Sequence, residues 1–144
     1  MSKLNVLSGV NLRVIKIPRD TAELSLEVKD KERPLIDRLE SLQDIISAEV
    51  GDTALTRARS LEREYDIRQL YIKYEGDNPT GTQKDRIAFA QIQDALRRGF
   101  DVISAATCGN YGVAVAYAAD LSGIRCVIYI HESFHTVRAV EMQA

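Results

Sequence analysis

Cysteine is scarce in this sequence, and the paired spacing that metal sites use is missing. The two cysteines, Cys108 and Cys126, lie eighteen positions apart, and no C-x-x-C spacing occurs. This argues against a zinc knuckle and against a disulfide framework. A reducing cytoplasm is therefore the expected setting.

Long apolar runs are also missing. No run approaches the roughly 20 residues that a membrane helix requires, and no charged start precedes the apolar core of a secretory leader. We therefore expect a soluble, unprocessed chain.

A strong charge of one sign is absent as well. Charged residues make up 28% of the 144 residues and the formal net charge is -2, so there is no basic surface of the kind that nucleic acid or an anionic membrane selects. A small-molecule substrate or a protein partner fits better. The length and the 45% of apolar residues are sufficient for one compact domain.

The first fifty residues predict a hairpin followed by a helix. Polar and apolar residues alternate over 10–14 and again over 24–28, and residues 18–21 supply turn chemistry between them. Pro34 is a suitable first helical residue, and an amphipathic stripe follows it. The stripe consists of Leu35, Leu39, Leu42 and Ile46.

The second half alternates short apolar runs with helical patterns separated by glycine. The predicted strands are 70–74, 101–105 and 124–130, and the predicted helices are 85–98, 109–121 and 134–144. This order indicates an α/β fold with a parallel βαβ sheet. Ligands of such sheets bind beyond the carboxyl ends of the strands, so residues 75–84, 105–110 and 131–134 are the loops of interest.

The loop before the first of these helices has a composition that imposes a particular backbone path. It contains Gly76, Asn78, Pro79 and Gly81, and Lys84 follows at the expected helix start. The helix dipole disfavours a cation there and is expected to lower the pKa of the lysine, which suits Schiff-base chemistry. By position alone, a solvated surface lysine is the simpler interpretation.

The loop after the second strand opens an alanine-rich helix. Residues 107–112 read T-C-G-N-Y-G, and their backbone N–H groups at a helix start form a natural anion site, suited to a substrate carboxylate. Asn110 adds a side chain that can donate or accept nearby. An ordinary strand-to-helix turn explains the glycines equally well.

Taken together, these loops resemble those of the fold-type II pyridoxal-phosphate-dependent enzymes, which include threonine synthase, threonine dehydratase, cysteine synthase and the tryptophan synthase β subunit. Residues 78–86 (N-P-T-G-T-Q-K-D-R) resemble the family pattern N-P-T-G-S-x-K-D-R, and residues 107–112 resemble S-x-G-N-x-G. Residues 51–55 (G-D-T-A-L) resemble the segment G-x-T-P-L, with Ala54 in place of the usual proline. The resemblance covers residues 50–144, and the flanks of the lysine are most similar to threonine synthase-like members.

The resemblance implies a tryptophan synthase β-like fold, pyridoxal 5'-phosphate as cofactor, and a lyase of amino-acid biosynthesis acting on a small amino-acid substrate. Lys84 would hold the cofactor as an internal aldimine and move the proton at the substrate α-carbon. Asn110 would hydrogen-bond the 3′ oxygen of the cofactor and orient its ring.

The resemblance also implies a set of residues on the substrate side. Thr107, Cys108 and Gly109 would border the substrate carboxylate, although many members have serine or threonine where Cys108 stands. Asp85 and Arg86 complete the lysine motif and are assigned to the same side.

Relative to the family, the chain is expected to be incomplete. The glycine-rich loop for the cofactor phosphate, and the group facing the pyridine nitrogen, lie further along in the family than this sequence extends. We expect residues 1–50 to form the hairpin and helix, and residues 51–144 to form part of the small domain with an open α/β core. Activity is then expected to need a carboxyl-terminal half or a second chain, in a homo-oligomer or with a complementing partner.

Three other functions are compatible with parts of the sequence. Residues 131–135 match H-E-x-x-H, a zinc hydrolase motif, but the motif requires both histidines on one helix and His131 follows a predicted strand. Cys108 at a helix start could be a thiolate nucleophile with His131 or His135 as its base. A truncated, non-catalytic binding or regulatory protein is the third, because an open α/β piece exposes a sheet face that partners can cover.

Overall fold

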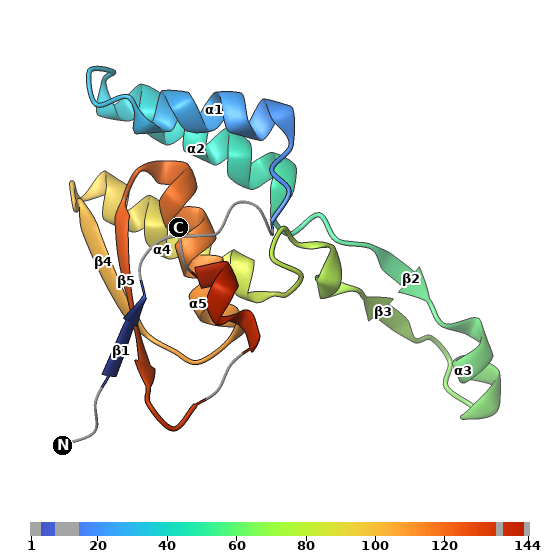
Figure 1. The fold of residues 1–144 in the computed structure, drawn as a ribbon. Helices are drawn as coiled ribbons and strands as arrows, with labels where there is room; N and C mark the ends of the chain where they lie inside the picture. Colours follow the sequence, from blue (N-terminus) through green and yellow to red (C-terminus); the bar gives the residue numbers. More distant parts are fainter. Residues whose placement is uncertain (1–3, 8–14, 135–136, 143–144) are drawn as a thin grey trace.

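A three-stranded sheet and a group of helices form the body of the molecule, which the computed structural model describes over residues 4–7, 15–134 and 137–142. The strand order is β1 (Leu4–Leu7), β5 (Arg125–His131) and β4 (Val102–Ala106). Strands β4 and β5 are parallel and β1 is antiparallel to β5, with Leu4 opposite His131 (Figure 1). The predicted α/β class and the parallel βαβ unit over β4 and β5 are confirmed.

Helix α5 (Asn110–Ser122) connects β4 to β5 and is the centre of the body. Ten of its thirteen residues are buried, because α4 (Lys84–Arg97), α1 (Arg19–Lys29), the sheet and the 3-10 helix η2 (Val137–Met142) pack around it. Alanine side chains at 114, 116, 118 and 119 allow these elements to approach the helix axis closely. The helix ends at Gly123, whose φ of +66 is readily adopted only by glycine.

Helix α4 has the predicted amphipathic face. Ala88, Phe89, Ile92 and Leu96 are buried with a period of three to four residues. Gly99 follows the helix with a φ of +75, as expected for a residue beyond a C-cap. The lysine loop therefore leads into a helix anchored in the core.

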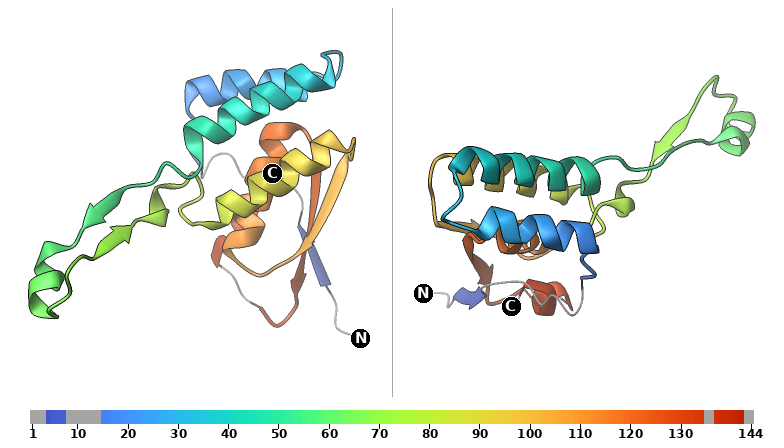
Figure 2. Two further views of the ribbon diagram at one scale, coloured as in Figure 1. Left: turned by 180° about the vertical axis from the view of Figure 1, so that it is seen from behind. Right: turned by 90° about the horizontal axis from the view of Figure 1, so that it is seen from above.

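Helices α1 and α2 (Leu35–Glu49) lie side by side and cover α4 and α5 (Figure 2). The strand predicted over 24–28 is wrong, because this segment belongs to α1. The buried residues of helix α1 are Thr21, Ser25 and Val28, spaced by four and three residues, whereas Leu26 is 70% exposed. The Ser25 Oγ hydroxyl donates to the carbonyl of Leu121 at 2.8 Å, so small side chains set a close contact between α1 and α5. The other predicted strand, 10–14, lies outside the described residues.

Residues 55–73 form an arm that projects away from the body (Figure 1). It consists of β2 (Leu55–Arg57), α3 (Arg59–Glu64) and β3 (Tyr71–Lys73), and the two strands pair antiparallel. The strand predicted over 70–74 therefore exists, but its predicted place in the parallel sheet is wrong. Tyr71 and Ile72 are about half exposed, so the apolar run that favoured a core strand is not buried here.

The end of the described chain is only partly helical in the predicted way. Residues 137–142 form η2, a 3-10 helix, where 134–144 was expected to be helical; residues 135–136 and 143–144 lie outside the described residues. Met142 in η2 is fully buried against α5. This short helix is therefore part of the body.

One apolar core joins the two halves of the sequence. Val28 and Leu42 from the first fifty residues belong to the same buried cluster as Phe89 and Tyr117. The division into units at residue 50 stays a prediction. In the part of the chain that the structure describes, no helix combines the length and apolar character needed to cross a membrane.

Candidate functional site

The loop that precedes Lys84 is shaped by buried polar side chains. Asn78 and Thr80 are 3% and 5% exposed, and Asp85 is fully buried in the first turn of α4. The backbone N–H of Thr80 donates to Asp85 Oδ2 at 2.9 Å, and the Thr80 hydroxyl donates to Asp85 Oδ1 at 2.7 Å. Burial raises the pKa of the Asp85 carboxyl, while these hydrogen bonds and the charge of Arg138 oppose that rise. Asp85 therefore holds the loop against the helix start.

A second group of contacts holds the other end of the loop. Arg86 donates from Nε and Nη2 to the two carboxylate oxygens of Glu75, both at 2.8 Å, and Nη2 also donates to the carbonyl of Gly51 at 2.9 Å. Glu75 lies in the 3-10 helix η1 (Glu75–Asp77), and the Arg86 guanidinium lowers the pKa of its carboxyl to about 2. Asn78 accepts from the N–H of Gly51 at 3.0 Å and donates to Glu75. We define Gly51, Thr53, Glu75, Asn78 and Arg86 as the arm root.

Ala54 stands where the family pattern has proline, and its backbone N–H makes a hydrogen bond. That group donates to Asp77 Oδ2 at 3.2 Å, a hydrogen bond that proline could not make. Thr53 beside it donates to Glu75 at 3.2 Å. This departure from the pattern is thus matched by a local contact between the 51–55 segment and η1.

Lys84 is the first residue of α4, as predicted, and its side chain is half-buried rather than fully solvated. Its backbone N–H donates to the hydroxyl of Thr82 at 3.3 Å. The loop and the helix together hold the lysine backbone at a defined place.

Asn110 is the first residue of α5 and is exposed. Its Oδ1 accepts a hydrogen bond from Nη1 of Arg138 at 2.8 Å, and Nη2 of the same guanidinium donates to the carbonyl of Thr80 at 3.0 Å. One side chain thus bridges the loop of Lys84 and the loop of Asn110. Sequence reasoning missed Arg138, since nothing in its own segment resembles a motif and only the packing of η2 on α5 brings it here.

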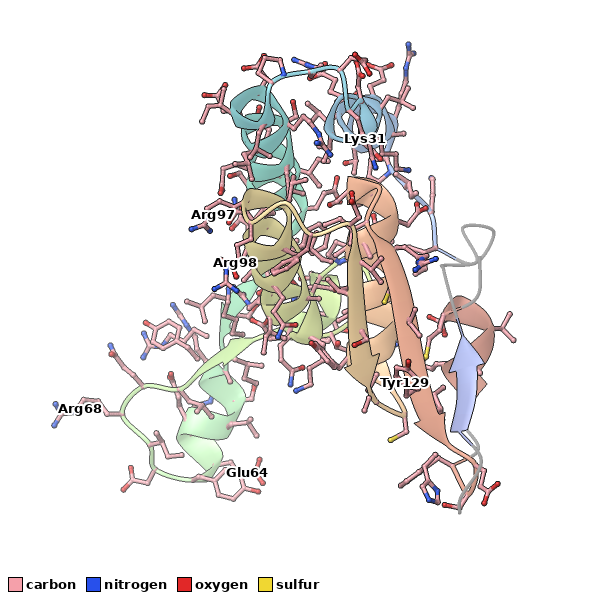
Figure 3. All side chains as sticks on the ribbon, turned by 90° about the vertical axis from the view of Figure 1, so that its left-hand side faces the viewer. Lys31, Glu64, Arg68, Arg97, Arg98 and Tyr129 are labelled. Atoms are coloured by element: carbon pink, nitrogen blue, oxygen red, sulfur yellow. The ribbon has the colours of Figure 1, made fainter. Side chains whose placement is uncertain are left out.

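Thr107 and Cys108 line a pocket of about 600 Å³ at the carboxyl ends of β4 and β5. Tyr129, labelled on β5 in Figure 3, also lines this pocket, together with His131 and Phe134. Residues of two of the three loops of interest, 105–110 and 131–134, thus line one pocket. Gly109 lies directly before α5, and its assignment to an anion site stays a prediction.

The structure also shows where the residues of the zinc hydrolase and thiolate alternatives lie. His131 is the last residue of β5, and its Nδ1 lies 2.7 Å from the hydroxyl of Ser133, so the first histidine of H-E-x-x-H is not on a helix. His135 lies outside the described residues, and those that are described contain no cluster of three or more potential metal-binding side chains. The thiol of Cys108 is exposed and shares a pocket with His131. The other cysteine, Cys126, is buried, and this burial raises the pKa of its thiol to about 11, which disfavours a thiolate there.

The remaining predicted site residues, Asp85 and Arg86, make the structural contacts described above. Both oxygens of Asp85 accept hydrogen bonds from Thr80, and Arg86 is paired with Glu75. Their assignment to the substrate side stays a prediction.

Comparison with known proteins places these loops in a wider context. The family model described as pyridoxal-phosphate dependent enzyme matches residues 46–144. The chain is 38% identical over 88 residues to threonine synthase from Methanocaldococcus jannaschii, a match that covers 61% of this chain and 22% of the relative. It is 34% identical over 99 residues to cysteine synthase B from Salmonella typhimurium, covering 66% of this chain and 32% of the relative.

A third relative also matches much of the amino-terminal part. The β subunit of 2-amino-4-ketopentanoate thiolase from Acetoanaerobium sticklandii is 34% identical over 136 residues, which is 89% of this chain and 29% of the relative. The chain thus spans less than a third of the length of each of these three relatives. With the lysine loop, the asparagine loop and the family match in agreement, the chain belongs to the pyridoxal-phosphate-dependent enzyme family of fold type II.

Proposed function

We propose that this chain is the cofactor-lysine portion of a pyridoxal-phosphate-dependent lyase of amino-acid metabolism, similar to threonine synthase. The observation that carries the proposal is the position of Lys84, which starts a core-anchored helix behind a loop fixed by Thr80 and Asp85. Threonine synthase and cysteine synthase among the relatives support a small amino-acid substrate.

The residues present fit one end of the cofactor. Lys84 offers an amine, and the Asn110 amide offers an N–H donor once its oxygen is bound by Arg138. An amine for the cofactor aldehyde and a donor for the ring oxygen are the groups that this part of the cofactor requires. By family resemblance, the glycine-rich loop that binds the cofactor phosphate belongs to the part of the relatives that this chain does not cover.

Each side chain has a role in this proposal. The cofactor, when bound, supplies a conjugated ring that stabilises negative charge at the α-carbon of an amino acid. Lys84 Nζ holds the cofactor and then moves the α-proton. Thr107, Cys108 and Gly109 border the substrate carboxylate at the start of α5, where the helix dipole favours an anion. Turnover needs the groups of a carboxyl-terminal half, supplied in the same or a second chain.

Selective capture of the cofactor by Lys84 tests this proposal. We expect pyridoxal phosphate added to the purified chain to give a visible absorbance band, and borohydride reduction followed by peptide mass spectrometry to place the label mainly on Lys84. Lys84→Ala should abolish the band. Lys31→Ala is the matched control, because Lys31 is a surface lysine whose side chain is 68% exposed (Figure 3). Labelling of Lys84 no stronger than that of Lys31 would show the proposal to be wrong.

A non-catalytic binding protein is the second candidate, and exposed apolar side chains favour it. On the sheet face opposite α5, Val102 is 41% and Tyr129 is 38% exposed, and Phe134 nearby is 57% exposed. Such a face suits burial against a partner. A homo-oligomer or a complementing chain fits both candidates, and the Lys84 experiment distinguishes them.

A further inference from the structure

Arg138 lies in a segment whose position is set by the core. Met142 of the same 3-10 helix is fully buried, and its Sδ and Cε lie 3.0 Å from the point where a Cβ on Gly112 would stand. A Cβ at position 112 would crowd this thioether and would lie 2.8 Å from Thr107 Cγ2, so the glycine leaves room for η2 at the first turn of α5. The backbone that carries Arg138 is therefore held beside Asn110.

The guanidinium of Arg138 has a defined orientation of its own. Nε donates to Glu141 Oε1 at 2.9 Å and Nη2 donates to Glu141 Oε2, a two-point pairing with one carboxylate. The Arg138 side chain is 23% exposed and that of Glu141 is 19% exposed. Other donors of the same guanidinium bond to Asn110 Oδ1 and to the Thr80 carbonyl, so this arginine is engaged by protein acceptors.

The contact with Arg138 decides which way the Asn110 amide faces. A guanidinium only donates hydrogen bonds, so the atom that faces it must be the oxygen and not the nitrogen of the amide. The N–H groups of Nδ2 then point away from Arg138. An exposed asparagine without this contact would sample both orientations of its amide.

We propose that Arg138 is a positioning residue for the cofactor, an inference that rests on the proposed function. It turns the Asn110 amide so that Nδ2 faces the ring oxygen as a donor, and its bond to the Thr80 carbonyl ties that amide to the loop of Lys84. Arg138 itself need not touch the cofactor. It acts by holding two loops in one arrangement before the cofactor arrives, which lowers the ordering cost of binding.

A double-mutant cycle with Asn110 tests this role, because an effect that acts through Asn110 must vanish when Asn110 is truncated. We expect Arg138→Met to weaken pyridoxal phosphate binding about tenfold, measured by titration of the visible band, and Arg138→Lys to weaken it less. In the Asn110→Ala background, Arg138→Met should cause no further loss. Arg98→Met is the control, since Arg98 lies at the far end of α4, paired with Asp94 (Figure 3).

A cofactor-free measurement separates failure of this inference from failure of the proposed function. Side-chain amide NMR should show a rigid Asn110 group, comparable to that of buried Asn78, and Arg138→Met should make it mobile while Asn78 stays rigid. An amide equally mobile in both proteins would overturn the inference even if no band forms. Equal or tighter cofactor binding by Arg138→Met, or an equal loss in the Asn110→Ala background, would also overturn it while leaving the role of Lys84 intact.

Discussion

The helical body and the arm over residues 55–73 differ in how far their apolar side chains are buried. In the body, Leu42, Phe89 and Ile92 are completely buried. In the arm, Leu55 and Tyr65 are more than 60% exposed, and both strands have every residue exposed. Glu64 and Arg68 mark the end of the arm in Figure 3, well away from Tyr129 on the sheet. The body can thus be stabilised by its own core, whereas the arm has no core of its own.

The arm is instead held at its base by polar contacts. The arm root joins Gly51 and Thr53 on one side to Glu75 and Asn78 on the other, with Arg86 of α4 between them. Within the arm, Arg57 Nε donates to Glu62 at 2.8 Å, and the N–H of Leu70 donates to the same carboxylate at 2.9 Å. Since the root also forms one end of the Lys84 loop, the polar contacts connect arm geometry to the candidate site.

Truncation of a core side chain gives the largest expected effect and tests the contrast directly. We expect Phe89→Ala to lower the free energy of unfolding by about 3–5 kcal/mol, because a large cavity is left between α4 and α5. Ile72→Ala in the arm should cost less than about 1 kcal/mol, because the side chain is already about half exposed. Denaturant unfolding of both variants is the measurement. Equal losses would mean that the arm apolar groups are buried in solution.

Acid should loosen the arm root before it affects the body. The pKa of Glu75 is lowered from 4.5 to about 2 by Arg86, so its contribution is present above about pH 4.5 and is lost as pH falls toward 2. We expect the protection factors of the Gly51 and Tyr74 amides, which correct exchange for its intrinsic slowing in acid, to fall in this window, while those of the α5 amides stay high. Arg86→Gln should shift the onset to higher pH, whereas Arg19→Gln, which removes an exposed pair with Glu23, should not. A uniform fall in protection factors across the molecule would contradict a separate arm root.

Close packing in the body leaves one hydroxyl unsatisfied, and its removal should have the smallest effect. Tyr117 is fully buried, and its hydroxyl has no hydrogen-bond partner among the described residues. We expect Tyr117→Phe to raise the free energy of unfolding by about 1 kcal/mol, seen as a melting temperature a few degrees higher. Tyr111→Phe is the control, since the Tyr111 hydroxyl donates to Gln91 and its loss should bring no gain. A destabilised Tyr117→Phe protein would show that the hydroxyl has a partner in solution.

Local pattern was sufficient to predict several elements of the body. The apolar period of Phe89, Ile92 and Leu96 predicted α4, and glycines at 99 and 123 correctly marked the ends of two helices. The pattern failed over 24–28, where alternation of Leu24, Leu26 and Val28 also fits a helix whose buried face carries the polar residues Thr21 and Ser25. Local sequence does not distinguish these cases, because the decisive contact is with Leu121, far along the chain.

The sequence by itself determined the family, the identity of the candidate lysine and the loop that carries Asn110. These features depend on short runs of residues whose backbone shape and chemistry are local. Only the tertiary structure decided that residues 71–73 leave the sheet and form an arm, and that Arg138 joins Asn110 to the Thr80 carbonyl. Strand pairing and a bridging guanidinium depend on which distant segments meet in the fold, and no spacing within either segment encodes that meeting.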